Sequence, residues 1–161
     1  MNIRYAALKD LQALSAIENL CFPKIEAADY STLKQRLEDY KECFWILEKE
    51  GQILSFINGM KTNQDDLLDS MYESNKYYQE NGDWLMIFGV DTIPNLQHNG
   101  YASILMRYVI AECREKKRKG IVLTCKENLI SFYEQFNFVN EGVSSSIHGG
   151  SIWYQMRYRI D

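Results

Sequence analysis

Apolar residues follow two different periods in the stretch from Trp84 to Gly120. Residues Trp84–Val90 form a nearly unbroken apolar run, which is typical of a buried β-strand. After a polar loop, apolar residues recur at intervals of three and four, which predicts one buried face of a helix: Tyr101, Ile104, Leu105, Tyr108 and Val109. Cations gather at positions 114–119, where they suit the negative end of a helix dipole, and Gly120 is the candidate C′ residue that ends the helix.

The pattern before this stretch predicts one strand, two helices and a β-hairpin. Asp10 is expected to cap the first helix, and Phe22-Pro23 is expected to end it. Glu50-Gly51 is the expected hairpin turn. The predicted elements are a strand over Asn2–Ala7, a helix that buries Leu11, Leu14, Ile17 and Cys21, a helix over Ser31–Tyr40, and hairpin strands over Cys43–Glu48 and Gln52–Lys61.

The remaining segments predict further alternation of strands and helices. Asn63–Gly82 is polar and rich in tyrosine, with a helix expected over Asp65–Tyr72 and a loop over Tyr77–Gly82. The later elements are expected as a strand over Ile121–Cys125, a helix over Asn128–Phe136 with Leu129, Phe132, Tyr133 and Phe136 inward, a strand over Phe138–Ser145, a turn at His148–Gly150 and a strand over Ile152–Arg159. This order predicts a mixed sheet with helices on both faces.

Composition narrows the classes of function. The chain has 161 residues, 46% of them hydrophobic, so we expect a single domain over residues 1–161 with a sizeable core. A net charge of −4 without a long basic tract argues against nucleic acid as the main partner. No signal peptide or long apolar run is present, and the four cysteines lack metal-type or disulfide-scaffold spacing. We therefore expect a cytoplasmic protein with no metal and no membrane partner.

The loop between the predicted strand Trp84–Val90 and the helix that follows it has the features of an anion site. Gln97–Ala102 joins the predicted strand to the helix, and the first N–H groups of a helix have no intrahelical partner. Gly100 allows a phosphate to approach the backbone, Ala102 is small, and the Ser103 hydroxyl adds a donor. An ordinary strand–loop–helix connection accounts for the same spacing equally well.

The spacing Gln97-x-x-Gly100-x-Ala102 resembles the pyrophosphate-binding signature of the GCN5-related N-acetyltransferase (GNAT) superfamily. A second segment, from Asn128 through Phe132-Tyr133 to Phe138, is similar to that superfamily's Asn…Phe-Tyr…Gly-Phe pattern. The likeness covers nearly the whole chain and is greatest to the arylalkylamine (serotonin) N-acetyltransferase-like group, over Cys125–Phe136 and Gly142–Met156. It implies an α/β (α+β) fold with a largely antiparallel sheet of about seven strands and a splayed central pair.

The resemblance also implies the chemistry, which is acetyl transfer from acetyl-CoA directly to an amine. Backbone groups of Phe88, Gly89 and Val90 would hold the pantetheine arm and polarise the thioester carbonyl. Tyr133 would return a proton to the CoA thiolate, although from the helical pattern alone a core tyrosine is the simpler reading. The matching positions also imply contacts with the cofactor from these residues: Gln97, His98, Asn99, Gly100, Tyr101, Ala102, Ser103, Asn128 and Tyr133.

The base that deprotonates the amine is not supplied by the resemblance. The arylalkylamine group uses two histidines of the central strand, and the matching positions here are Trp84 and Met86, which accept no proton. A water chain ending at Asp83 or Asp91 is one alternative, and the absence of a dedicated base is another. Either carboxylate also fits an ordinary solvated loop position.

The acceptor pocket is expected to be aromatic. By the resemblance, His148, Ser151 and Trp153 line it, Trp84 and Met86 face it from the central strand, and Phe22-Pro23 closes it. Glu26 would attract the ammonium group, and stacking on aromatic walls suits a flat apolar amine. The alternative for these residues is that they are core and turn residues.

Three functions follow as hypotheses. The first is N-acetylation of a small amine, aromatic or polyamine in type. The second is acetylation of a protein N-terminus or lysine, which needs an open groove, and the third is an acyl-CoA-binding sensor module without turnover. The expected ligands are acetyl-CoA and the amine, and the assembly is a monomer or a homodimer.

Overall fold

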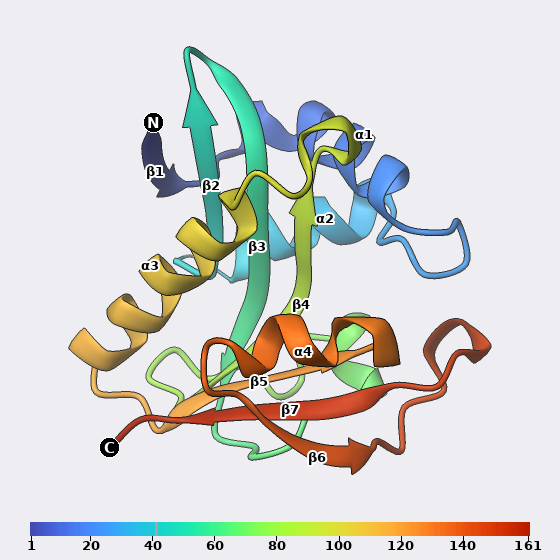
Figure 1. Cartoon of the computed structure of the whole chain (residues 1–161), viewed down its shortest axis with the longest axis vertical. Coiled ribbons are helices and arrows are strands. Elements are labelled where there is room, and N and C mark those ends of the chain that lie inside the picture. Colours follow the sequence, from blue (N-terminus) through green and yellow to red (C-terminus); the bar gives the residue numbers. More distant parts are fainter. Residues whose placement is uncertain (41) are drawn as a thin grey trace. The chain divides into compact units, whose positions relative to one another are not determined.

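In the part of the chain that the structure describes, seven β-strands form a mixed, mostly antiparallel sheet in the order β1-β2-β3-β4-β5-β7-β6. β4 and β5 are parallel, whereas the pairs β1–β2, β2–β3, β5–β7 and β6–β7 are antiparallel. The strands are β1 Asn2–Tyr5, β2 Phe44–Lys49, β3 Gln52–Thr62, β4 Trp84–Thr92, β5 Gly120–Cys125, β6 Val139–Val143 and β7 Tyr154–Arg159. The helices are α1 Leu11–Cys21, α2 Tyr30–Asp39, α3 Tyr101–Glu115 and α4 Ile130–Glu134 (Figure 1). The predicted fold class is confirmed.

The computed structural model describes residues 1–40 and 42–161. The chain forms two compact units. Unit 1 comprises Met1–Gly59 and Gly89–Val109, and unit 2 comprises Met60–Phe88 and Ile110–Asp161. No helix in the described part of the chain has both the length and the apolar character needed to cross a membrane.

In unit 1, α1 and α2 pack on the hairpin formed by β2 and β3. Their buried side chains form one cluster with those of the strands: Leu11, Leu14, Ile17, Leu33, Phe44, Ile46, Ile53 and Phe56. Asp29 caps α2 because its carboxylate accepts the Thr32 N–H at 2.8 Å. Phe22 is the C-cap residue of α1, as the Phe22-Pro23 pair predicts. The helical spacing of apolar residues predicted for this part of the chain is thus confirmed.

Asp10 does stand at the N-cap position of α1, but its carboxylate does not cap that helix. It accepts the Ala7 N–H at 2.8 Å and two N–H groups of Arg4, each at 2.8 Å. These bonds close the short 3₁₀ turn Leu8–Asp10 in front of α1 and tie β1 to it. The capping prediction is therefore wrong for α1, because a guanidinium competes for the carboxylate.

The β2–β3 hairpin turns through two residues with positive φ. Glu50 has φ 51° and Gly51 has φ 79°, the combination that a type I′ turn requires. The predicted turn at Glu50-Gly51 is confirmed. A Cβ added at Gly51 would meet nothing within 4 Å, so only backbone strain opposes a side chain there.

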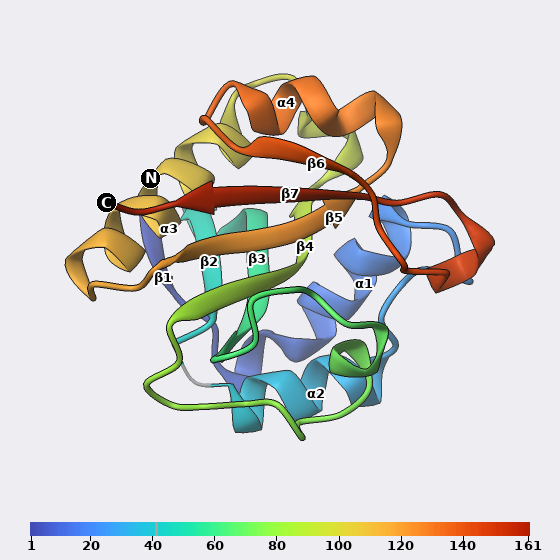
Figure 2. The ribbon, with the colours of Figure 1, turned by 90° about the horizontal axis from the view of Figure 1, so that it is seen from below.

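In unit 2, β7 lies between β5 and β6, and Figure 2 shows these three strands side by side. α4 is preceded by a 3₁₀ turn over Glu127–Leu129 and packs against β6 and β7. Leu129, predicted to face inward, is 41% exposed because it belongs to this 3₁₀ turn, where the helical period does not hold. The segment before β4 contains one 3₁₀ turn, Asp69–Tyr72, in place of a longer helical stretch.

The apolar stripe of α3 is rotated relative to the prediction. Its buried residues are Leu105, Met106, Val109, Ile110 and Cys113. Ile104 and Tyr108, both predicted to be buried, are 40% and 42% exposed. The helix ends at Glu115, and Lys117 adopts the left-handed conformation with φ 59°. The expectation that Gly120 is the C′ residue is therefore wrong, since Gly120 begins β5.

Gly120 is required by close packing between strands. A Cβ at this position would overlap the carbonyl oxygen of Tyr158 on β7 and would lie 2.8 Å from Cζ3 of Trp84. We expect Gly120→Ala to lower the free energy of unfolding by about 1–3 kcal/mol, because a packed strand cannot move away. Gly51→Ala is the comparison variant. Because the space at this turn is open, the change should lower the free energy of unfolding by only about 1 kcal/mol, which is the cost of backbone strain. Urea denaturation of both variants measures the difference, and equal losses would contradict this reading.

Candidate acyl-CoA and acceptor site

The loop between β4 and α3 leaves the first amides of α3 unused by the helix. The first intrahelical bond runs from the Ile104 N–H to the Gly100 carbonyl at 3.0 Å, so the N–H groups of residues 101–103 have no intrahelical acceptor. Gly100 has φ 82°, and a Cβ there would meet nothing within 4 Å. The backbone thus offers an open donor surface at the positive end of a helix dipole, which suits an anion.

Side chains of the loop support this conformation from within. Gln97 Nε2 donates to the Thr92 carbonyl at 3.3 Å, and Asn99 Nδ2 donates to the Leu96 carbonyl at 2.9 Å. His98 adopts a positive φ of 68°. The amide side chains of Gln97 and Asn99 therefore bond to the backbone at the end of β4 and within the loop, which holds Gly100 and the helix start in place. Tyr101, Ala102 and Ser103 open the helix and are partly exposed.

The predicted thioester segment differs in burial from the rest of β4. Trp84–Ile87 and Asp91-Thr92 are buried, whereas Phe88, Gly89 and Val90 are partly exposed. The parallel pairing between β4 and β5 covers Trp84–Met86 of β4 and Gly120–Val122 of β5, and each strand continues beyond it. The two strands therefore pair only at their start, as a splayed central pair requires.

Tyr133 lies in α4 and is buried among aromatic rings. Its ring contacts Phe132 at 5.0 Å and Phe138 at 5.8 Å between centroids, both edge to face. The Tyr133 carbonyl also accepts the Phe138 N–H at 3.3 Å. These contacts hold the ring in place, and the hydroxyl group on it is the part that a proton donor would use.

The structure brings His148 and Trp153 together and adds Tyr72, which the sequence pattern did not single out. The rings of Tyr72 and His148 stack at 4.8 Å with an interplanar angle of 8°, and Trp153 follows His148 at 5.9 Å. Trp153 Nε1 donates to the His148 carbonyl at 2.7 Å. On its other side Tyr72 contacts Phe88 of β4 at 5.1 Å. A continuous aromatic row therefore connects β4 to the turn before β7.

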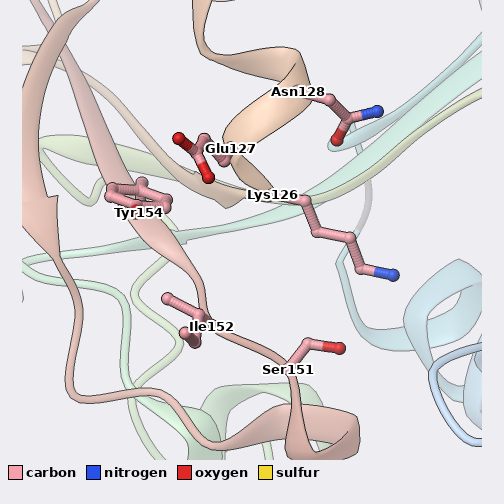
Figure 3. A pocket seen from close by; sticks show the side chains of 6 residues that line it. All are labelled: Lys126, Glu127, Asn128, Ser151, Ile152 and Tyr154. Atoms are coloured by element: carbon pink, nitrogen blue, oxygen red, sulfur yellow. The ribbon is translucent and has the colours of Figure 1, made fainter.

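A pocket of about 560 Å³ opens in unit 2 beside this row. Two segments line it: Lys126, Glu127 and Asn128 before α4, and Ser151, Ile152 and Tyr154 at the entry to β7 (Figure 3). Asn128, expected at the cofactor, and Ser151, expected at the acceptor, thus share one pocket. Lys126 Nζ lies 5.7 Å from the ring centre of Trp153, which joins the pocket to the aromatic row.

Trp84, Met86 and Phe22 are the other side chains expected at the acceptor. Trp84 is buried, with the guanidinium groups of Arg157 and Arg159 at 4.9 and 5.7 Å from its ring. Met86 is fully buried in β4. Phe22 is half-buried at the end of α1 in unit 1, where Glu26 follows it in the turn that begins at Pro23. These residues do not line the pocket beside the aromatic row.

Comparison with known proteins decides the family. The sequence pattern of the Acetyltransferase (GNAT) family matches residues 11–138. The chain belongs to the GNAT acetyltransferase family. A search of curated proteins by sequence found no match.

Solved GNAT structures share the fold at low sequence identity. The GphF GNAT-like decarboxylase in complex with isobutyryl-CoA has a TM-score of 0.87 at 18% identity, covering 100% of both chains. The loading GNATL domain of CurA from Lyngbya majuscula has a TM-score of 0.85 at 16% identity, covering 98% of this chain and 96% of that one. The ribosomal-protein-S18-alanine N-acetyltransferase from Escherichia coli has a TM-score of 0.74 at 15% identity, covering 99% of this chain and 94% of that one.

The two acids suggested as a base for this GNAT protein have very different surroundings. Asp83 is half exposed and pairs with Lys119 at 3.4 Å, as a solvated loop carboxylate does. Asp91 is fully buried in β4, and burial, then the charge of Glu18, raise its pKa well above the usual range. Glu18 on α1 is a residue that the sequence pattern missed, because a charge on the buried face of an amphipathic helix is visible only once its neighbours are known.

Proposed function

We propose that this GNAT protein transfers the acetyl group of acetyl-CoA directly to a primary amine, a small aromatic amine or a polyamine. The open backbone at Gly100, at the start of a helix of 15 residues, is the observation that carries the proposal. Family membership supports acetyl-CoA as the cosubstrate, and the similar GphF protein was solved with an acyl-CoA. No metal is required for this reaction.

In this proposal the amides of residues 101–103 bind the pyrophosphate of CoA, with Gln97, His98 and Asn99 shaping the loop. Phe88, Gly89 and Val90 hold the pantetheine arm and thioester through their backbone. Their partial exposure within an otherwise buried strand supports this role. Asn128, which lines the pocket beside α4, is proposed as a further cofactor contact.

Tyr133 is proposed as the acid that protonates the departing thiolate. The nitrogen of the amine attacks the acetyl carbon, the C–S bond breaks with its electron pair going to sulfur, and the tyrosine hydroxyl supplies the proton. The proton that the nitrogen loses returns to the tyrosinate, so Tyr133 ends the cycle unchanged. The fixed ring of Tyr133 supports this role, since an acid must be held in position.

The aromatic row of Tyr72, His148 and Trp153 is proposed to bind the acceptor, with Ser151 as a polar contact. Stacked rings favour a flat amine or the methylene chain of a polyamine. The likeness to the arylalkylamine group points to the same class. Phe22, Trp84 and Met86 remain candidates only through that likeness. We also propose a cytoplasmic location, in line with the composition of the sequence, and assembly as a monomer or a homodimer.

Release of free thiol from acetyl-CoA tests the proposal. The purified chain is assayed with tryptamine, 2-phenylethylamine, spermidine and an alanine-terminated tetrapeptide. Thiol release with a small amine but not the peptide supports the proposal, and the reverse result favours protein N-terminal acetylation. CoA binding without release for any acceptor favours the sensor hypothesis. Mass spectrometry of the acyl-CoA also registers decarboxylation, the activity named for the similar GphF protein.

A further inference from the structure

One carboxylate in unit 2 joins the two turns that carry the stacked rings of Tyr72 and His148. Asp69 opens the short 3₁₀ turn that ends at Tyr72, and its Oδ1 accepts a hydrogen bond from Ser146 Oγ at 2.5 Å. Its Oδ2 accepts the Ile147 N–H at 3.0 Å, and His148 is the next residue. These two bonds therefore connect the backbone that carries Tyr72 to the backbone that carries His148.

The turn that contains His148 is bonded to Asp69 and to Trp153 through the same few atoms. Ser146 Oγ, which donates to Asp69, also accepts the His148 N–H at 3.3 Å. The His148 carbonyl accepts from Trp153 Nε1 at 2.7 Å. Both backbone polar groups of His148 are thus engaged. A shift of Ser146 would therefore move His148 and, through it, the indole of Trp153.

The ring of Tyr72 is held by its hydroxyl group and by a ring of β4. The hydroxyl shares a hydrogen bond with Thr124 Oγ1 of β5 at 3.2 Å, and the ring centre lies 5.1 Å from that of Phe88. The planes of Tyr72 and His148 differ by only 8°. Because aromatic contacts depend on the offset and angle of the rings, this stack requires that the two turns keep their relative position.

The segment that carries Tyr72 has a second attachment at its start. The guanidinium group of Arg157, a buried residue of β7, donates to the Asp65 carbonyl at 2.5 Å and to Asp66 Oδ1 at 2.6 Å. These bonds fix the start of the segment on β7. The carboxylate of Asp69 adds an attachment at the turn itself, where the position of Tyr72 is decided.

A carboxylate near an amine site could instead bind the ammonium group directly. In Asp69 both oxygens already accept a hydrogen bond from the protein, one from Ser146 and one from Ile147. Hydrogen bonds to a charged group are among the stronger ones in proteins, so an ammonium would have to compete with two of them. The geometry therefore favours a role in holding the two turns over a contact with the amine.

We propose that Asp69 is a positioning residue of the acceptor site, which sets the distance and angle between Tyr72 and His148 and so fixes the aromatic row. This inference rests on the proposed acetyl transfer. Asp69 does not touch the amine and acts only through the two turns that it joins. Its loss should therefore weaken the binding of an acceptor that stacks on the row and leave the transfer step itself unchanged.

Asp69→Ala tests this role. With 2-phenylethylamine, KM should rise on the order of 10-fold while kcat and the affinity for acetyl-CoA stay near wild type. With pentylamine, which has no ring to stack, KM should change by roughly twofold at most. Asp69→Asn should restore most of the loss, because its Oδ1 can accept the Ile147 N–H while its Nδ2 donates to Ser146 Oγ.

Asp65→Ala is the matched control, since Asp65 is an exposed acid of the same segment and bonds to Arg157 through its backbone carbonyl. It should leave KM unchanged, and urea denaturation midpoints of all variants register any general loss of stability. An equal rise of KM for the two amines, a fall in kcat without a rise in KM, or no rescue by Asp69→Asn would overturn the proposal.

The link between the two turns has a further signature, which does not depend on turnover. Without the carboxylate, the Ile147 N–H loses its acceptor, so its hydrogen exchange should be on the order of 10-fold faster in Asp69→Ala and unchanged in Asp65→Ala. Unchanged exchange in Asp69→Ala would overturn the inference even in a chain that acetylates amines. Faster exchange in a chain that turns over no amine would support the link and refute the proposed function instead.

Discussion

Replacing Gly100 with glutamate is expected to weaken acetyl-CoA binding on the order of 10²-fold, which corresponds to about 2.7 kcal/mol. The new carboxylate would stand beside the free amides of residues 101–103 and repel the pyrophosphate that they are proposed to bind. The fold should survive, since a Cβ at Gly100 meets nothing within 4 Å and only the positive φ of 82° adds strain. That strain amounts to about 1–2 kcal/mol.

Two further variants at the same position separate charge, bulk and strain. Gly100→Gln has the size of glutamate without its charge, and Gly100→Ala has the same backbone strain with little bulk. We expect calorimetry with CoA to rank the affinities as glycine, alanine, glutamine, glutamate, from tightest to weakest. An unchanged affinity in Gly100→Glu would place the pyrophosphate elsewhere and would remove the main support for the proposed function.

Tyr133→Phe is expected to lower kcat on the order of 10²-fold while leaving CoA affinity and stability near wild type. Only the hydroxyl is lost, and the ring keeps its edge-to-face contacts with Phe132 and Phe138. Without an acid, the thiolate must leave unprotonated or take a proton from water, which raises the barrier of the step in which the C–S bond breaks. A structural tyrosine in the same place would instead lose stability and keep its kcat.

The matched control is Tyr108→Phe, an exposed tyrosine of α3 whose hydroxyl has no proposed role. Thiol release is measured from pH 6 to 10 for both variants, together with their urea denaturation midpoints. Wild-type turnover by Tyr133→Phe at every pH would exclude this residue from the mechanism. The cofactor site would then be tested by the Gly100 variants alone.

Local signals predicted most of the elements correctly. The type I′ turn at Glu50-Gly51 needs two positive φ angles, and a glycine in the second position is the sequence signal that predicts such a turn. Pro23 ends α1 because it cannot continue a helix. The strand Trp84–Val90 and the loop Gln97–Gly100 were placed for similar reasons, since a run of apolar residues and a glycine before a helix are recognisable without any neighbour.

The errors arise where tertiary packing decides. Both Ile104 and Ile110 are apolar residues of α3, and the sequence does not say which of two adjacent stripes meets the sheet. Lys117, rather than Gly120, adopts the left-handed conformation, and the glycine is needed instead by a strand that approaches it closely. In each case the pattern was compatible with two structures, and packing selected one of them.

The candidate site also combines features that local sequence predicts with features that depend on tertiary contacts. The Gly100 loop is local in sequence and was predicted from it. Tyr72 and Glu18 were missed because their roles depend on distant partners: Tyr72 stacks on His148, and Glu18 meets Asp91 of β4. A polar, tyrosine-rich segment and a charge on an amphipathic helix have many ordinary explanations, so contacts across the sequence are needed to distinguish them.

The position of β7 has a consequence for the last steps of folding. β7 follows β5 and β6 in the sequence, yet it lies between them and is hydrogen-bonded to both. Until Tyr154–Arg159 has paired, β5 and β6 each have an open edge where β7 belongs. Chains in which β7 has not yet paired therefore expose unpaired strand edges, and at that stage chaperone binding or aggregation competes with completion of the sheet.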